Sequence, residues 1–320
     1  MINTKSKICI ILAPKSEKLV NEIITWIKRL KVSFFRITDL DEIKIINVDI
    51  LKFKIVYRNS SIKNDNILSF WNRKGELNTI NFNDNKNIKI LSHCERESLT
   101  VFSYLVQQLE EKKNLGNYFL QIPNKLNHLY LAQKSGLEIP KTTITNNKEA
   151  IKSLNKDSPN IINKSLSDSF TGTFNQTYYY NHTERISKEI IEDLEESFFP
   201  SLFQEELEKA YELRIVFVQE KLWSMAIFSQ NDTKTEVDCR NYNYEKPNRK
   251  MPFKLPIEVS ENVRKFIRIS GLNTGAIDMV VTKDKKYVFL ECNPNGQISM
   301  VSEHCNYYIE KYIAEYLSTP

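Results

Sequence analysis

A carboxylate and an amide lie at the end of an apolar run near the carboxyl terminus. The segment 276–281 reads AIDMVV, the segment 287–291 reads YVFLE, and the polar stretch TKDKK separates them. Two short apolar runs joined by a polar turn are typical of a β-hairpin. Glu291 closes the second run, and Asn293 follows in the sequence NPNG. The expected hairpin therefore ends in oxygen-bearing side chains.

The register of this hairpin decides which side chains meet. If Asp284 and Lys285 form a two-residue loop, pairing back along the strands places Asp278 directly opposite Glu291. Residues two apart on a strand share a face, so Asn293 joins them. The alternative is that Glu291 and Asn293 only end a strand and open a turn, because Asn-Pro and Asn-Gly are common turn sequences.

Facing carboxylates need a cation or protons between them. Like charges directly opposite each other in a sheet repel and cost stability. Two acids and an amide offer only oxygen ligands, which suits Mg²⁺, an ion that binds through a few carboxylates plus substrate phosphates. Asp278, Glu291 and Asn293 are therefore a predicted magnesium site, and the substrate that this site implies is a nucleotide.

A bound nucleotide also needs groups that hold its phosphates. Neither GxxxxGK[ST] nor GxGxxG occurs in the chain, which has only seven glycines. Lys164 lies inside the apolar stretch NIINKSL, where a lysine is costly unless its ammonium is paired, although a solvent-facing lysine on an edge strand fits the same pattern. Lys125 lies at an expected helix start, where anions bind. The loop 165–173 could close over phosphates, or be a plain surface loop.

Arg214 and Arg240 could bind a phosphate or a carboxylate. A planar guanidinium forms two parallel hydrogen bonds to such an anion. A surface ion pair explains each arginine equally well, for instance Asp238 with Arg240. The histidines lack ligand spacing and no Ser/His/Asp order is evident, so we assign them no role: His93, His128, His182 and His304.

Composition excludes several classes of protein. The chain has 320 residues, of which 27% are charged, and a mean hydropathy of -0.43. No run approaches the roughly 18 apolar residues of a membrane span, and no signal peptide is evident, so we expect a cytoplasmic protein without a membrane partner. The net charge of +5 is spread along the chain and does not indicate nucleic acid. Five scattered cysteines argue against a disulfide framework or a structural zinc site.

The elements that must position these residues alternate between strand and helix. A strand is expected at 7–13, an amphipathic helix at 16–30, and further strands at 32–37 and 52–58. A terminal amphipathic helix is expected at 304–317. This alternation predicts an α/β fold class with α+β elements.

The order of short motifs resembles the ATP-grasp ligases. The motifs are, in order, NK, INK, QEEL, ELR, VDCR, AID and ECNPNGQ. The resemblance implies an ATP-grasp fold, with a small N-terminal α/β domain at residues 1–115 and two α+β subdomains that clasp ATP. These would be a central subdomain with a lid loop at 116–203 and a C-terminal subdomain with the metal site at 204–320.

The resemblance also implies a role for each motif residue. By position, Lys125 and Lys164 match the lysines that hold the phosphates. Glu205, Glu206 and Leu207 match the hinge that reads the adenine, and Glu212 matches the ribose contact. Arg214 and Arg240 match the arginines that steady the transferred phosphate and the acyl-phosphate, and Asp278, Glu291 and Asn293 match the ligands of two magnesium ions.

Other segments are similar to particular ATP-grasp ligases. The text SQ...VDCR resembles the SQ...DWR of microviridin-type peptide cyclases, and FWNRKGELN and GQISMVSEHCNYYIEKYIAEYL resemble the grasp-with-spasm maturases of graspetides. Such enzymes act with a short precursor peptide, made of leader and core, and with a radical SPASM protein encoded nearby; dimers are common among them. This chain departs from the pattern of these ligases in two ways: Cys239 stands where Trp is usual, and the lid is poor in glycine. Both departures concern the acceptor pocket.

The implied function is closure of peptide macrocycles. ATP and Mg²⁺ would activate an Asp or Glu side chain of the precursor as an acyl-phosphate, and a Ser or Thr hydroxyl or a Lys amine would then form an ester or amide. One alternative is an amino-acid ligase of the glutathione-synthetase or glutamate-ligase type. The other is a non-catalytic protein that senses a nucleotide or binds a peptide.

Overall fold

The chain forms two compact units. The computed structural model describes residues 7–38, 40–41, 43–75, 88–158, 160–167, 171–180, 183–230 and 247–320. The first unit takes Met1–Gln121, Leu272–Thr274 and Gln297–Pro320, and the second takes Ile122–Gly271 and Gly275–Gly296. The three domain ranges expected from the sequence stay a prediction.

A four-stranded parallel sheet lies at the centre of the first unit. Its strand order is β2-β1-β6-β7, and every residue of β1 is buried, as expected for a parallel strand covered on both faces. The strands are β1 (Ile8–Leu12), β2 (Ser33–Ile37), β6 (Ile67–Asn72) and β7 (Lys113–Leu115). The strand expected at 7–13 is confirmed.

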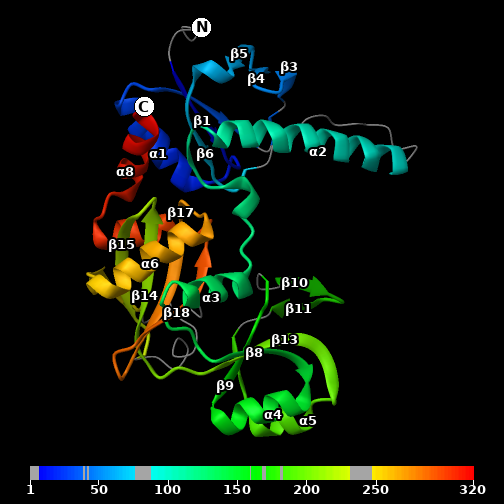
Figure 1. Cartoon of the computed structure of the whole chain (residues 1–320), viewed down its shortest axis with the longest axis vertical. Coiled ribbons are helices and arrows are strands. Elements are labelled where there is room, and N and C mark those ends of the chain that lie inside the picture. The colour runs from blue at the N-terminus through cyan, green and yellow to red at the C-terminus, as the bar shows by residue number, and fades with distance from the viewer. Residues whose placement is uncertain are drawn as a thin grey trace. The chain divides into compact units, whose positions relative to one another are not determined.

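Helices from both ends of the chain pack together in this unit (Figure 1). The first unit's helices are α1 (Lys18–Arg29), α2 (Ile88–Glu110), η2 (Tyr118–Leu120), α7 (Ile298–Cys305) and α8 (Ile309–Ser318). The terminal helix expected at 304–317 is confirmed as α8 from Ile309 onward, but its expected start is wrong, because Asn306 and Tyr308 have φ of 52° and 53°. That left-handed backbone breaks the helix and separates α7 from α8.

A small antiparallel sheet completes the first unit. Its strands are β3 (Lys44–Asp49), β4 (Lys52–Tyr57) and β5 (Ser60–Lys63), followed by η1 (Asn64–Asn66). One face of β4 carries Phe53, Ile55 and Tyr57, and these side chains join the core formed with α2.

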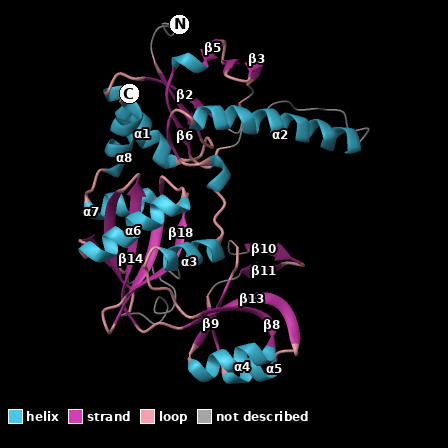
Figure 2. Ribbon diagram, in the orientation of Figure 1, coloured by secondary structure: helices cyan, strands magenta, loops and turns pink. Residues whose placement is uncertain are grey.

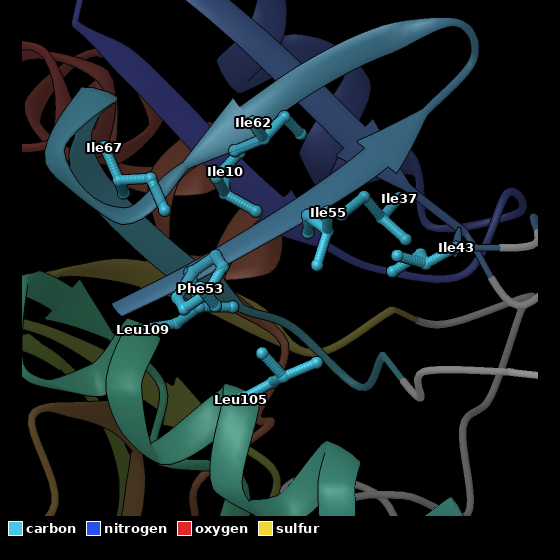
Figure 3. A pocket seen from close by; sticks show the side chains of 9 residues that line it. All are labelled: Ile10, Ile37, Ile43, Phe53, Ile55, Ile62, Ile67, Leu105 and Leu109. Carbon is cyan, nitrogen blue, oxygen red and sulfur yellow. The ribbon is translucent and has the colours of Figure 1, made fainter. Parts of the chain in front are cut away.

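The core between this sheet and α2 contains a small gap (Figure 3). Its free volume of about 10 Å³ admits about one water-sized sphere. A water there would find no hydrogen-bond partner, because every lining side chain is apolar. The lining residues are Ile10, Ile37, Ile43, Phe53, Ile55, Ile62, Ile67, Leu105 and Leu109. The gap is therefore a packing defect and not a ligand site.

The described residues of the second unit form a four-stranded sheet, a five-stranded sheet and a two-stranded hairpin, and the four-stranded sheet has the strand order β12-β9-β13-β8. Its strands are β8 (Thr142–Asn147), β9 (Ile161–Lys164), β12 (Glu184–Ile186) and β13 (Ser197–Glu205), and its helices are α4 (Lys148–Asp157) and α5 (Lys188–Asp193). Both helices cover one face, with Ile151, Ile161 and Phe203 in the shared core (Figure 2). A separate hairpin is formed by β10 (Thr171–Phe174) and β11 (Thr177–Tyr180).

The second sheet of this unit is five-stranded, in the order β16-β15-β14-β17-β18. The strands are β14 (Lys209–Val218), β15 (Lys221–Phe228), β16 (Arg249–Phe253), β17 (Thr274–Thr282) and β18 (Tyr287–Asn293), and the helices are α3 (Lys125–Lys134) and α6 (Ile257–Ser270). Phe266 of α6 packs on Phe289 of β18, with ring centroids 5.1 Å apart. The opposite face carries the polar residues of the site. The predicted α/β class is thus confirmed.

Within the described residues, every helix is too short or too polar to span a bilayer.

Candidate active site

The strands β17 and β18 bring two carboxylates face to face. Asp278 pairs directly with Glu291, and Asn293 pairs with Ala276 two positions along the same face. The side chains of Asp278 and Glu291 are 28% and 30% exposed. The predicted hairpin and the predicted facing pair are therefore confirmed.

The route to this pairing differs from the expected one. Thr282 N donates to Lys286 O over 3.0 Å, so the loop has three residues and not two. The register then shifts between Asp278 and Met279, where β18 carries Leu290 as an additional residue. Such a bulge restores the alignment that a longer loop would otherwise displace.

The turn after β18 fixes the asparagine. Asn293 Oδ1 accepts from Asn295 N at 2.8 Å, and Asn293 O accepts from Gly296 N at 3.0 Å. A Cβ atom at Gly296 would lie 2.4 Å from the Cβ of Ala276, so only glycine fits this close approach. The NPNG sequence therefore holds the Asn293 side chain beside the carboxylate pair.

An arginine partly balances the acidic pair. Arg214 Nη1 lies 2.7 and 2.5 Å from the two carboxylate oxygens of Asp278. Burial raises the pKa of Asp278; the Arg214 guanidinium opposes this, and the charge on Glu291 raises the pKa further. Arg214 thus pairs with Asp278, and the charge of Glu291 is left to a second cation.

The donor set fits a hard divalent cation. The group contains two carboxylates and an amide oxygen, and a cation between them relieves the repulsion. In the ranges that the structure describes, no cluster of three or more His, Cys, Asp or Glu could hold a metal ion. A metal at Asp278, Glu291 and Asn293 would accordingly need waters or substrate oxygens to complete its coordination, which is usual for Mg²⁺.

Lys125 lies beside the acidic pair. It begins α3, whose N-cap Asn124 accepts from Asn127 N. Its Nζ is 3.9 Å from Glu291 Oε2 and donates to the carbonyl oxygens of Ser165 and Ser167 at 3.0 and 2.8 Å. A cation at this place would be able to bind a phosphate next to a metal ion at Glu291, and this role stays a prediction.

Lys164 lies at the end of β9 and pairs with Leu202 of β13. Strand alternation puts it on the face opposite Ile161, which packs under α4 and α5. The lysine therefore belongs to the sheet face that these helices leave uncovered.

The expected hinge connects β13 to β14. Glu205 Oε1 accepts from Lys141 N at 2.8 Å, and Glu206 binds Arg185 at 2.7 Å. Both carboxylates hold neighbouring segments in place, so recognition of an adenine at Leu207 would fall to the backbone. The hinge role itself stays a prediction.

Glu212 lies two residues before Arg214 on β14 and shares its face. Its Oε1 accepts from Lys209 Nζ at 2.7 Å and from Ser229 Oγ at 3.1 Å. The structure thus brings Glu212, Arg214 and the acidic pair onto one face of the five-stranded sheet. Arg240 and Cys239 lie outside the described residues.

His128 is a residue for which the sequence predicted no role. It is 6% exposed, and its Nδ1 lies 3.1 Å from the carbonyl oxygen of Cys292. Because a carbonyl only accepts, Nδ1 carries the proton. Burial lowers the pKa of His128, against the opposite effects of the Cys292 carbonyl and Glu291. The imidazole ties α3, which carries Lys125, to the strand that carries Glu291; its helical spacing with buried Leu129 and Ala132 was the available signal.

Comparison with solved structures identifies the fold. A RiPP-associated ATP-grasp ligase of Chryseobacterium gregarium, in complex with ADP and a leader and core peptide, has 20% identity and a TM-score of 0.82, covering 98% of this chain and 95% of that chain. The macrocyclase MdnC of Microcystis aeruginosa MRC, bound with precursor peptide MdnA, has 25% identity and a TM-score of 0.77, covering 97% and 99%.

A more distant similarity links the chain to a D-alanyl-alanine synthetase. D-alanyl-alanine synthetase A of Vibrio cholerae has 13% identity and a TM-score of 0.55, covering 99% of this chain and 98% of that chain. No protein-family model and no curated protein matches the chain. The chain therefore has the ATP-grasp ligase fold, and the solved structures that it resembles include peptide macrocyclases.

Proposed function

We propose that the chain is an ATP-dependent ligase that closes macrocycles in a precursor peptide. The observation that carries the proposal is the similarity, over 97% of the chain at 25% identity, to a macrocyclase bound with its precursor peptide. The facing carboxylates Asp278 and Glu291, with Arg214 on one of them, supply the polar groups that phosphate activation needs.

The proposed roles follow the positions in the second unit. They are Lys125 and Lys164 on the phosphates, Glu205, Glu206 and Leu207 at the adenine, Glu212 at the ribose, Arg214 and Arg240 at the transferred phosphate and the acyl-phosphate, and Asp278, Glu291 and Asn293 as the magnesium ligands.

The reaction would proceed in two steps. A side-chain carboxylate oxygen of the peptide attacks the γ-phosphorus of ATP, the bond to the bridging oxygen breaks, and ADP leaves. A Ser or Thr hydroxyl or a Lys amine then attacks the acyl carbon and gives up its proton, and inorganic phosphate leaves. The peptide loses one water for each ring. Arg214 would orient the phosphate, so that positioning and electrostatics supply the acceleration.

The proposed role of the metal is electrostatic. Magnesium, when bound, offsets the negative charge of the phosphate oxygens during transfer. Asp278, Glu291 and Asn293 would hold it, and we propose two ions, the number that the motif resemblance implies.

The proposed partners are those of similar ligases. We propose a precursor peptide with leader and core as the substrate, a homodimer as the working form, and a radical SPASM protein encoded nearby. Because ATP is consumed, we propose that the protein acts in the cytoplasm.

Incubation with ATP, Mg²⁺ and the peptide encoded beside the gene would test the function. We expect ADP release and loss of one water per ring by mass spectrometry, with tandem spectra placing each link between an acidic residue and a Ser, Thr or Lys. Glu291→Gln is the inactive control. Addition of a free amino acid to the substrate would instead establish the ligase of small substrates, and no ADP with any peptide would favour a binding protein.

A further inference from the structure

The carboxylate of Glu212 accepts hydrogen bonds through one of its two oxygens. Lys209 Nζ and Ser229 Oγ both donate to Oε1, at 2.7 and 3.1 Å. In the part of the chain that the structure describes, the hydrogen bonds to this carboxylate all end on Oε1. Since each carboxylate oxygen can accept about two hydrogen bonds, Oε2 keeps its full capacity for a ligand.

The hydrogen bonds of Lys209 and Ser229 to Glu212 are shielded from solvent. The side chains of Lys209 and Glu212 are 10% and 14% exposed, and Ser229 is fully buried. The ion pair of Lys283 with Glu208 in the same unit is 70% and 79% exposed and longer, at 3.3 Å. A shielded charged hydrogen bond holds its geometry much better than an exposed one.

The donor and acceptor roles of the Ser229 hydroxyl are defined by its neighbours. A carboxylate can only accept, so the Ser229 hydroxyl donates to Glu212. The same hydroxyl accepts from Gln230 Nε2 at 3.0 Å. Ser229 directly follows β15, whose Ile227 pairs with Glu212 across the ladder. The contact is therefore set by strand register as well as by the side chains.

The open oxygen lies on the face of the candidate active site. Glu212 shares a β14 face with Arg214, and Arg214 binds Asp278. Acceptors on this face suit the hydroxyl groups of a sugar, each of which can donate one hydrogen bond.

We propose that Lys209 and Ser229 are positioning residues that present Glu212 Oε2 to the ribose hydroxyls of the nucleotide. They thereby set the preference of the site for nucleotides that carry these hydroxyls. The proposal rests on the proposed nucleotide site, and it adds a requirement for two residues that do not themselves touch the ligand.

Binding of ADP and of 2′,3′-dideoxy-ADP, measured by calorimetry with Mg²⁺, tests the assignment. We expect the native chain to bind ADP at least about tenfold more tightly, the size of one hydrogen bond to a charged group. Ser229→Ala and Lys209→Met should reduce this preference to within about twofold. The loss should fall on ADP, while affinity for the dideoxy nucleotide stays unchanged. Lys209→Arg, which keeps a cationic donor, should retain most of the preference.

Two controls separate positioning from general damage. Ser224→Ala removes a serine of β15 whose Oγ donates to Phe253 O at 2.6 Å, and Lys283→Met removes the exposed pair; both should keep the native preference. If Ser229→Ala fails to fold by circular dichroism, Lys209→Met decides. Native discrimination that persists in the folded variants would overturn the positioning role alone. A native chain that binds no ADP would overturn the nucleotide site as well.

Discussion

At the scale of single residues, the candidate active site depends most on two acids, Asp278 and Glu291, whose proximity is unfavourable without a cation. Asp278 and Glu291 face each other across a ladder, where like charges destabilise a sheet. Alternation of side chains made this pair predictable from the sequence. His128 was not predictable, because its partner is a backbone carbonyl 164 residues away, and a carbonyl leaves no mark in the sequence.

Removing either acid should stop the reaction and leave the fold. Glu291→Gln or Asp278→Asn should lower turnover by at least about 100-fold, the usual effect of losing an electrostatic group in an active site. The melting temperature should not fall with Glu291→Gln, because the substitution relieves repulsion. Glu208→Gln, an exposed acid of the same unit, is the matched control. Turnover near the native rate in both acid variants would remove these residues from the site.

At the scale of elements, turns and bulges set the geometry that strand patterns leave open. The sequence predicted the β17–β18 hairpin but not its three-residue loop or the additional residue at Leu290. Each deviation shifts the register by one, and together they cancel. The polarity pattern cannot show such a cancellation, because loop length depends on local backbone geometry.

The NPNG turn gives a prediction at this scale. Gly296→Ala should destabilise the protein by about 1–3 kcal/mol through overpacking and weaken Mg²⁺-dependent activity by moving Asn293. Ala276→Gly in the same chain removes the atom that the new Cβ would meet, so the double variant should recover part of both losses. Urea unfolding and turnover measure the two effects. Additive losses in the double variant would contradict the proposed clash.

The corner after β2 gives a pH prediction. Burial would raise the pKa of Asp41, but hydrogen bonds from Thr38, Arg58 and Tyr57 lower it. A lowered folded pKa stabilises the protein above the unfolded value of 3.8, and this contribution disappears as pH falls through the folded value.

Asp41→Asn should therefore cost about 1–2 kcal/mol at pH 7, and the difference from the native chain should shrink at pH 3. Urea unfolding at both pH values measures it. The same difference at the two pH values would show that the charge of Asp41 contributes nothing.

At the scale of the whole molecule, local sequence patterns predicted the fold class but not the contacts between segments that are distant in the sequence. Alternating strands and helices predicted the α/β class, and short motifs predicted the ATP-grasp fold, both of which are confirmed. Patterns did not predict that α8 returns to pack on α1 and on β6. Ser69 Oγ of β6 donates to Leu317 O of α8 at 2.6 Å. Such long-range contacts depend on the packing of surfaces and not on the order of residues.

Nucleotide binding should stabilise the whole chain. ADP at about 100 times its Kd should add about 2.7 kcal/mol in the presence of Mg²⁺, seen as a higher melting temperature by calorimetry. Asp278→Asn combined with Glu291→Gln should remove the Mg²⁺-dependent part of this increase. An increase of the same size with and without Mg²⁺ in the native chain would argue against a metal-bound nucleotide.

Anomalous diffraction from a crystal grown with ADP and Mn²⁺ in place of Mg²⁺ tests the central claim most directly. We predict an anomalous peak within coordination distance of Asp278, Glu291 and Asn293, next to the terminal phosphate of ADP. A peak elsewhere, or ADP bound away from these side chains, would contradict it.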